Sequence, residues 1–497
     1  MIRKLSVVTL LLYSHFLLGQ GPSQDSLVQK SPLLIQEFYA PVSFSGYQGS
    51  EIKLPLKVKA NLDFLLNTGG SFVNEVSPVY AGYVNAGVVL KSRNKTLNLD
   101  YSMASLGLGN YMSEFVDSTG VLSKFGAATQ EKFGYWANRI RGRFNWQISK
   151  HFNAEIGNHT NFLGNGYRSM VLGENTAPYP YLKLTTKVWK IKYTNLFMQL
   201  RDLQPEASWK DSRQKYVALH SVDFKVNERF SFTVFESVVW QSSDTLSNRG
   251  FDINYLNPVI FYRPVEFSQG SADNVLLGIA ARVSVDKYFM WYGQLFLDEF
   301  LLSEVREGVG WWANKVGMQI GVQAANLLPG FWAYSEFNSA RPFTYTHGSV
   351  LQNYAHRNQS LAHPLGTNFY EWSTGAQLER NEWTFTGRFN WALYGRDLNE
   401  DNYGGDVFRS YKKPFRVYNN KTGQGNTHHS YITQLTASRK ILKNRDVFFF
   451  GSYNWRHVQN QFELNDEHIF SFGISSSVYK ISSKNSNGAL PSLSNDF

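Results

Sequence analysis

The chain has no cysteine, little proline, few charged residues and no long apolar run in its interior. Its 497 residues include no Cys and only 15 Pro, and 18% of them are charged. Without cysteine there can be no disulfide framework and no thiolate metal site. The mean hydropathy is −0.33, and no interior run approaches the ~18 apolar residues that a helical span needs. The sequence therefore argues against a helical membrane protein.

Aromatic residues are abundant instead. Phe (37), Tyr (28) and Trp (13) make up 16% of the chain, and 43% of all residues are hydrophobic. This content can bury a large core, which argues against a disordered chain. The formal net charge is +10.

The first residues predict an export signal. Arg3 and Lys4 form a basic stretch, residues 6–18 are apolar, and Gly19 is a small residue at a plausible cleavage point. An N-terminal membrane anchor is the alternative, although the apolar run is short for a span. Because no cysteine follows the run, a lipoprotein anchor is excluded. We expect a signal peptide over residues 1–19.

The dominant pattern of the remaining chain is alternation at a period of two residues. Residues 139–148 and 383–393 each place aromatic side chains on one face and polar side chains on the other, as amphipathic strands do. Many runs are about 9–12 residues long, and a tilted strand needs ~9–11 residues to cross a bilayer. Polar three-residue connections predict hairpins, and they lie at 227–229, 286–288 and 380–382.

Two all-β architectures are compatible with these strands. A soluble sandwich or propeller would bury the aromatic faces in a core, whereas a membrane barrel would turn them to lipid around a polar lumen. The export signal, the aromatic residues near strand ends and the mixture of tight turns with long loops favour the barrel. The residues expected to face lipid are Phe144, Trp146, Phe389 and Trp391. The long connections lie at 163–181, 341–369 and 395–428.

We therefore predict an all-β protein, a transmembrane antiparallel β-barrel of 16–18 strands in the outer membrane of a Gram-negative bacterium. A small helical or loop plug is an optional part of this prediction. The predicted divisions are a signal peptide (1–19), an N-terminal segment with periplasmic or plugging residues and the first strands (20–80), the barrel (81–480) and a flexible polar tail (481–497).

An arginine ladder is the sharpest local feature. Arg139, Arg141 and Arg143 share one strand face, and an Arg directed into lipid costs roughly 2–4 kcal/mol at the bilayer midplane. The ladder must therefore face the lumen. Its guanidinium groups could hold carboxylate or phosphate groups of a ligand. The alternative is that they pair with Asp and Glu residues on neighbouring strands.

Two histidines, His356 and His363, flank Arg357 in a predicted loop. They could be metal ligands, but no third ligand lies nearby at a suitable spacing, so we expect ordinary loop histidines and no metal site. The chain contains no G-x-S-x-G, Walker or H-E-x-x-H motif. We predict no enzymatic activity, no cofactor and no nucleic-acid partner.

Three segments resemble the Wzi-like capsule-assembly barrels of the outer membrane. Residues 162–184 match through Gly164, Gly166, Arg168, Ser169, Leu172, Asn175 and Pro180. Residues 269–285 match through Gly270, Asp273, Asn274, Leu276 and Gly278. Residues 354–375 match through Tyr354, His356, Asn358, Gln359, Leu361, His363, Pro364 and Gly366.

The resemblance is closest to the Bacteroidetes branch, which includes RemB-like proteins linked to gliding motility. The match departs from the family pattern at Gly173 and Glu174, where the family usually has Ser and Asp. The resemblance implies an 18-stranded barrel that binds or organises surface (capsular) polysaccharide. The RemB-like branch implies a motility or surface-adhesion component that binds a protein partner, and a diffusion porin is a further alternative.

These alternatives differ in what they require of the loops and the lumen. A protein-binding role needs an apolar patch on the outer loops, and a porin needs an open lumen. The expected partners are outer-membrane lipid and surface polysaccharide, with export or motility proteins as further candidates. Because the chain is basic, we expect an acidic glycan. The candidate glycan contacts are Arg139, Arg141, Arg143, Tyr167, Arg168, Asn175, Tyr179, Asp273, Asn274, Arg357 and His363.

Overall fold

A computed structural model describes residues 57–73, 76–132, 134–202, 212–243, 250–257, 273–299, 301–442 and 445–476. The predicted signal peptide (1–19) and polar tail (481–497) lie outside these residues. Among the residues described, no helix is long and apolar enough to cross a membrane.

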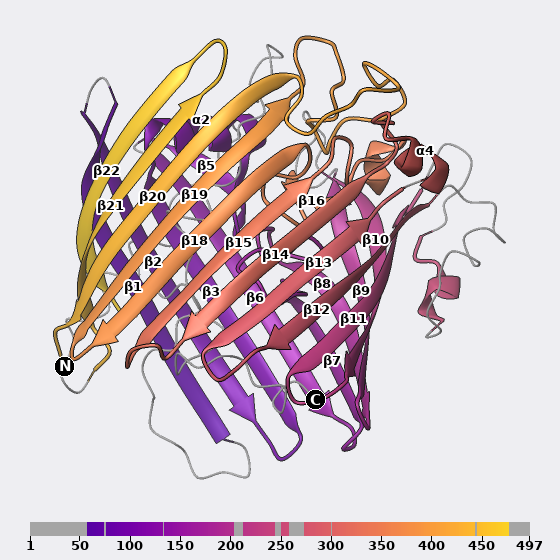
Figure 1. The fold of residues 1–497 in the computed structure, drawn as a ribbon. Coiled ribbons are helices and arrows are strands. Elements are labelled where there is room, and N and C mark those ends of the chain that lie inside the picture. Colours follow the sequence, from indigo (N-terminus) through magenta and orange to yellow (C-terminus); the bar gives the residue numbers. More distant parts are fainter. Residues whose placement is uncertain are drawn as a thin grey trace.

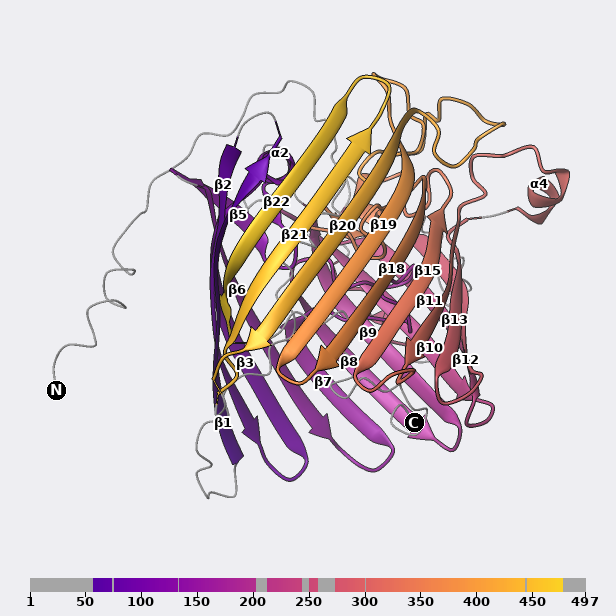
Figure 2. The ribbon, with the colours of Figure 1, turned by 60° about the vertical axis from the view of Figure 1, so that its left-hand side comes forward.

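Within these described ranges, eighteen antiparallel strands close into a single barrel (Figures 1 and 2). Each strand pairs with the next one along the wall, and β22 closes the ring on β1 with Ser475 opposite Leu65. The predicted barrel of 16–18 strands is confirmed. In chain order the strands are β1 (Lys57–Phe72), β2 (Val76–Lys91), β3 (Lys95–Gly107), β6 (Gly134–Gln147), β7 (Phe152–His159), β8 (Tyr179–Val188), β9 (Ile191–Asp202), β10 (Arg213–Lys225), β11 (Phe230–Gln241), β12 (Asn274–Ser284), β13 (Phe289–Leu297), β14 (Val316–Ala325), β15 (Phe331–Ala340), β18 (Phe369–Arg380), β19 (Trp383–Arg396), β20 (Asn426–Lys440), β21 (Phe448–Gln459) and β22 (Leu464–Ser475).

The remaining short elements lie in the connections at one end of the barrel. They are α2 (Asn110–Thr119), β4 (Val121–Leu122), β5 (Gly126–Glu131), η2 (Ile253–Leu256), α4 (Leu302–Glu307), η3 (Val350–Gln352), β16 (Ala355–His356) and β17 (Gln359–Ser360). β1 and the start of β2 fall within the predicted 20–80 segment, and the described part of the barrel wall starts with Lys57.

The two faces of each strand follow the alternation in the sequence. Along β19, Thr384, Thr386 and Arg388 are buried inside the barrel, whereas Trp383 and Phe385 are exposed on its outer surface. The same alternation places all four residues expected to face lipid on the outer surface, namely Phe144, Trp146, Phe389 and Trp391.

The two ends of the barrel differ in the length of their connections. At the short-turn end, the side chain of Asn227 accepts the N–H groups of Arg229 and Phe230 at 2.8 and 2.9 Å. Asn381, in another of these turns, has a φ of 57°, a left-handed conformation that Asn tolerates better than most residues. The opposite end carries the long loops, which include 160–178, 298–315, 341–368 and 397–425.

A charge placed on the outer surface should test this arrangement directly. We expect Phe389→Arg to destabilise the barrel by roughly 2–4 kcal/mol, because the residue lies near the middle of β19 on the lipid face. Trp383→Arg is the matched control on the same face at the strand end, where the cost falls to about 0–1 kcal/mol. Urea unfolding in lipid vesicles measures both, and equal losses would contradict the assigned membrane depth.

Candidate functional site

The loop between β7 and β8 (160–178) folds into the barrel. Met170, Val171 and Leu172 are almost completely buried there. Gly164 has a φ of 145°, which favours glycine. A Cβ atom added to Gly166 would lie 2.6 Å from Glu336 Oε2 on the barrel wall. The glycines therefore let the loop backbone approach the inner wall closely.

Glu336, on β15, receives the loop backbone. The N–H groups of Tyr167 and Arg168 donate to its two carboxylate oxygens at 2.8 and 2.9 Å. The hydroxyl of Tyr292, on β13, donates to the same carboxylate at 2.8 Å. The buried carboxylate is thus satisfied partly by the loop, and the loop is tied to the wall.

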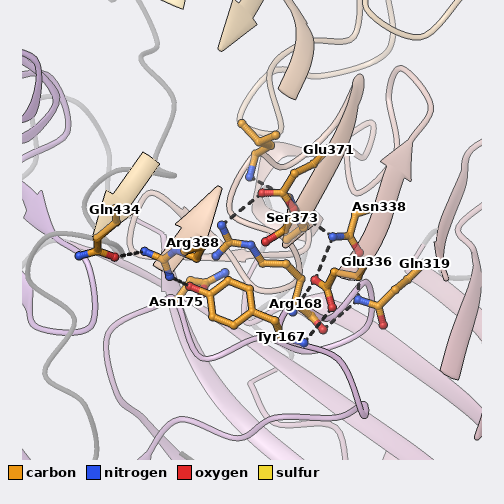
Figure 3. Close-up of polar contacts among 12 residues, drawn as sticks. Tyr167, Arg168, Asn175, Gln319, Glu336, Asn338, Glu371, Ser373, Arg388 and Gln434 are labelled. Atoms are coloured by element: carbon orange, nitrogen blue, oxygen red, sulfur yellow. Dashed lines mark hydrogen bonds and ion pairs between the residues drawn. The ribbon is translucent and has the colours of Figure 1, made fainter. Parts of the chain in front are cut away.

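Glu371, on β18, receives the loop side chain (Figure 3). Arg168 Nη2 lies 3.2 Å from one carboxylate oxygen, and His363 Nε2 lies 2.7 Å from the other. Asn338 donates to Glu371 at 3.0 Å. Burial lowers the pKa of His363, and the charge of Glu371 opposes this effect. We call Tyr167, Arg168, Glu336 and Glu371 the loop latch.

Tyr167 extends the latch to the next strands. Its ring stacks on Tyr334 with centroids 5.0 Å apart, and its hydroxyl accepts a hydrogen bond from Arg388 on β19. Arg388 also donates to Gln434, on β20, at 2.6 Å (Figure 3). The loop therefore contacts a continuous series of wall strands from inside the barrel.

The loop between β15 and β18 (341–368) packs against the 160–178 loop inside the barrel. Asn175 donates to the carbonyl of Ala362 at 3.2 Å. His356 lies edge-on to Tyr179 with centroids 5.7 Å apart, and its Nδ1 accepts the N–H of Arg201 at 3.0 Å. Burial lowers the pKa of His356 well below its usual value. These contacts join the 341–368 loop to the 160–178 loop and to the strands β8 and β9.

Helix α2 lies against the inner wall at the long-loop end. Its buried residues are Tyr111, Met112, Phe115 and Val116. The guanidinium of Arg456, on β21, lies 3.2 Å from the ring centroid of Tyr111. Glu467, on β22, accepts the N–H of Asn110 at 3.0 Å. The plug that the sequence prediction left optional is present, and it combines a helix with two loops.

The arginine ladder faces the lumen as predicted. Arg141 Nε lies 2.9 Å from Asp100, and Arg143 Nε lies 3.6 Å from Glu155. Arg139 donates to the carbonyl of Lys124 at 3.0 Å and to Ser102 at 3.2 Å. For Arg141 and Arg143 the structure therefore agrees with the alternative of pairing with luminal carboxylates.

The other candidate residues lie in separate places. Asp273 accepts hydrogen bonds from Tyr255 at 2.7 Å and Gln352 at 3.0 Å, and Asn274 donates to the Gln352 carbonyl at 2.9 Å. These two residues attach β12 to the 341–368 loop. The backbone N–H of Arg357 donates to the carbonyl of Arg201 at 2.9 Å. Of the predicted set, only Tyr167, Arg168 and His363 meet at the latch.

The buried positions of these residues affect their predicted role as glycan contacts. Arg168, Tyr179 and His363 are at most 3% exposed, so a polysaccharide could reach them only if the loops opened. The wall partners Glu336, Glu371 and Arg388 were missed by the sequence reasoning. The sequence does show that these three residues are charged and lie at inward-facing positions of amphipathic strands. That pattern does not identify which loop they contact.

A second group of side chains, also missed from the sequence, lies in the long loops. The ring of Trp312 lies 5.0 Å from Tyr411, 5.6 Å from Phe343 and 6.2 Å from Trp311, measured between centroids. We call these four residues the loop aromatic group. Lys315 Nζ lies 4.1 Å from the ring centroid of Tyr411. Three separate loops supply the group, and only Phe343 is fully buried.

The comparisons with known proteins give structural matches alone. No family model matches the chain, and no curated protein matches it. The structure is similar to that of Wzi from Escherichia coli, described as an outer-membrane protein involved in group 1 capsule assembly and a carbohydrate-binding β-barrel. The TM-score is 0.51 at 11% identity, over 84% of this chain and 85% of Wzi. The chain is an outer-membrane β-barrel.

Two Pseudomonas aeruginosa barrels match at lower scores. OprD has a TM-score of 0.44 at 10% identity, over 88% of this chain and 98% of its own. OccK8 (OprE) has a TM-score of 0.44 at 8% identity, over 84% and 97%. The closed barrel and its similarity to Wzi, not these two lower matches, confirm the predicted fold and the Gram-negative outer-membrane location. The predicted RemB-like branch stays a prediction.

The location also orients the barrel. Outer-membrane barrels have short periplasmic turns and longer extracellular loops. The long-loop end, with α2, α4 and the loop aromatic group, therefore faces the cell exterior.

Proposed function

We propose that this protein is a non-enzymatic barrel that binds surface polysaccharide on its extracellular loops. The observation that carries the proposal is the loop aromatic group, which three extracellular loops supply at the long-loop end of a barrel whose lumen is filled by the 160–178 loop, α2 and other residues of the 341–368 loop. The carbohydrate binding described for the structurally similar Wzi supports the same function.

The chemistry of the loop aromatic group suits sugar rings. Trp311, Trp312 and Tyr411 are half-buried, so they are held in place while part of each ring is accessible. Flat aromatic faces pack against the C–H faces of pyranose rings, and neighbouring polar groups bond the hydroxyls. Exposed Lys412 and Lys413 follow Tyr411 directly, and they supply positive charge for an acidic glycan.

The filled lumen weighs against the porin alternative. A diffusion pore needs a continuous water path, whereas Arg168, Tyr179 and His363 are buried within the barrel. A motility or adhesion role would require an apolar surface for a protein partner. One exposed apolar surface on the extracellular loops is formed by Leu301, Leu302 and Val305, on and beside α4.

Truncation of the aromatic group should weaken glycan binding. We expect Trp311→Ala combined with Trp312→Ala to reduce polysaccharide binding roughly 5- to 30-fold, since losing a central aromatic contact typically costs ~1–2 kcal/mol or more. Binding of polysaccharide from the producing cells to purified barrel in vesicles is the measurement. Replacing both residues with Phe should preserve most of the binding.

The control is Trp189→Ala. Trp189 is 77% exposed in a short periplasmic turn, where it cannot meet an extracellular glycan. If all three variants bound equally well in correctly folded barrels, the proposed contact surface would be wrong.

A further inference from the structure

The loop between β13 and β14 carries an exposed apolar surface on and beside α4. Leu301, Leu302, Val305 and Val309 are 49%, 52%, 48% and 38% exposed. We call these four residues the apolar shelf. At 100° per residue, the first three fall on one side of the helix, and Glu307 falls opposite. The helix therefore presents a continuous apolar side that the described part of the chain does not cover.

The shelf continues the lipid-facing surface of the barrel. It follows β13, on which Trp291 and Leu295 are exposed on the outer surface, and precedes β14, on which Met318 is exposed on the same surface. Figure 2 shows α4 on the right, outside the outline of the barrel and at the extracellular end. A segment that projects beyond the wall at this level lies over membrane lipid, not over the lumen.

The shelf is held in a defined position. Gly308 and Gly310 have φ values of 68° and 67°, which turn the chain sharply after the helix. The chain then pairs with the 397–425 loop, where Asn419 donates to the carbonyl of Val309 at 2.8 Å and Asn420 to that of Gly310 at 2.9 Å. The apolar shelf is therefore attached to a second extracellular loop.

Two cations and two carboxylates lie on or close to the shelf, and the cations suit phosphate groups. Arg306 is exposed beside the apolar side of the helix, and exposed Lys421 follows the segment that pairs with Gly310. Glu304 lies between the apolar side and the opposite side, and Glu307 points away from the apolar side. Arg306 therefore supplies a cation at one border of the apolar side and Glu304 a carboxylate at the other. An apolar helix side with a cation at its border is typical of a segment that lies in the interface of an anionic membrane.

We propose that the apolar shelf rests in the outer leaflet of the outer membrane beside β13 and β14, with phosphate-bearing lipid as its occupant. The shelf then extends the barrel's lipid contact outward and fixes the level of the 298–315 loop, which also carries Trp311 and Trp312. The lipid contact itself does not depend on the proposed glycan binding.

Because the native chain has no cysteine, a single thiol label can report on the shelf without a background. Leu302→Cys and Val305→Cys carry an environment-sensitive fluorophore in full-length barrels refolded into phosphatidylglycerol vesicles, and Glu307→Cys is the matched control on the same helix. We expect blue-shifted emission and strong quenching by spin-labelled lipid at positions 302 and 305. At position 307 we expect quenching by aqueous iodide instead.

Other occupants give different results. Iodide quenching at positions 302 and 305 equal to that at 307 would mean that the shelf is in water and available to a protein partner, and this would overturn the proposal. Disulfide cross-linking between Leu302→Cys chains in dilute vesicles would indicate a second copy of the chain and would also overturn it. Heat-modifiable migration in gels verifies that each labelled barrel is folded.

Discussion

Replacing Glu371 with alanine should cost the barrel about 3–5 kcal/mol of stability, since removing one partner of a buried ion pair leaves the other charge uncompensated. Glu371 is fully buried and contacts both Arg168 and His363. The variant leaves the guanidinium of Arg168 in the barrel without its carboxylate. Urea unfolding of the refolded protein in vesicles measures the loss.

The control for this variant is an exposed ion pair on the same barrel. Glu382 lies 3.4 Å from Arg439, and both side chains are about half exposed. Such pairs contribute about 0–1 kcal/mol, so Glu382→Ala should have little effect.

Arg168→Ala combined with Glu371→Ala should cost less than the sum of the single variants, because the effects of substituting two contacting residues are not additive. Additive losses would show that the latch pair does not act as a unit.

Excising the tip of the latch loop should convert a closed barrel into a conducting one. Leu163 and Leu172 form an antiparallel bridge, with the N–H of Leu163 donating to the Leu172 carbonyl at 3.0 Å. Residues 164–171 can therefore be replaced by a two-residue Asn-Gly turn with little strain. The excision removes Tyr167 and Arg168 from the lumen and exposes the polar inner faces of β13, β15 and β18 to water.

Single-channel recording in planar bilayers gives the result. We expect no large stable current from the unmodified barrel and reproducible conductance steps from the excised one. Excision of residues 303–307 is the control, because α4 lies outside the barrel outline (Figure 2). Stable conductance from the unmodified barrel would favour the porin alternative. An excised barrel that folds and does not conduct would show that α2 and the 341–368 loop close the lumen on their own.

The motif residues that carry the resemblance have a structural explanation here. Gly164 and Gly166 allow the loop to approach the wall, and Arg168 pairs with Glu371. Ser169 Oγ accepts the N–H groups of Val171 and Leu172, each at 3.1 Å. A loop folded into a barrel needs such residues whatever the barrel binds. The proposed glycan contacts lie in other loops, where no motif marked them.

The sequence alone was sufficient for the barrel and for the direction of its side chains. Alternation at a period of two assigns each residue of a strand to the lipid or the lumen, since successive side chains point to opposite faces. Lipid also excludes charge from one of these faces, which placed Arg139, Arg141 and Arg143 correctly before any contact was known. Hairpin turns were predictable because their polar residues satisfy the backbone locally.

Only the tertiary structure decided what fills the lumen and what remains outside. Arg168 and Glu371 are separated by 203 positions in the chain, and strand periodicity contains no information on which distant loop meets which wall. For the same reason the sequence did not predict that Trp312, Phe343 and Tyr411 would meet from three loops. The projection of α4 beyond the barrel also depends on where β13 and β14 stand in the closed ring. These contacts join distant segments, so barrel closure and loop packing determine them together.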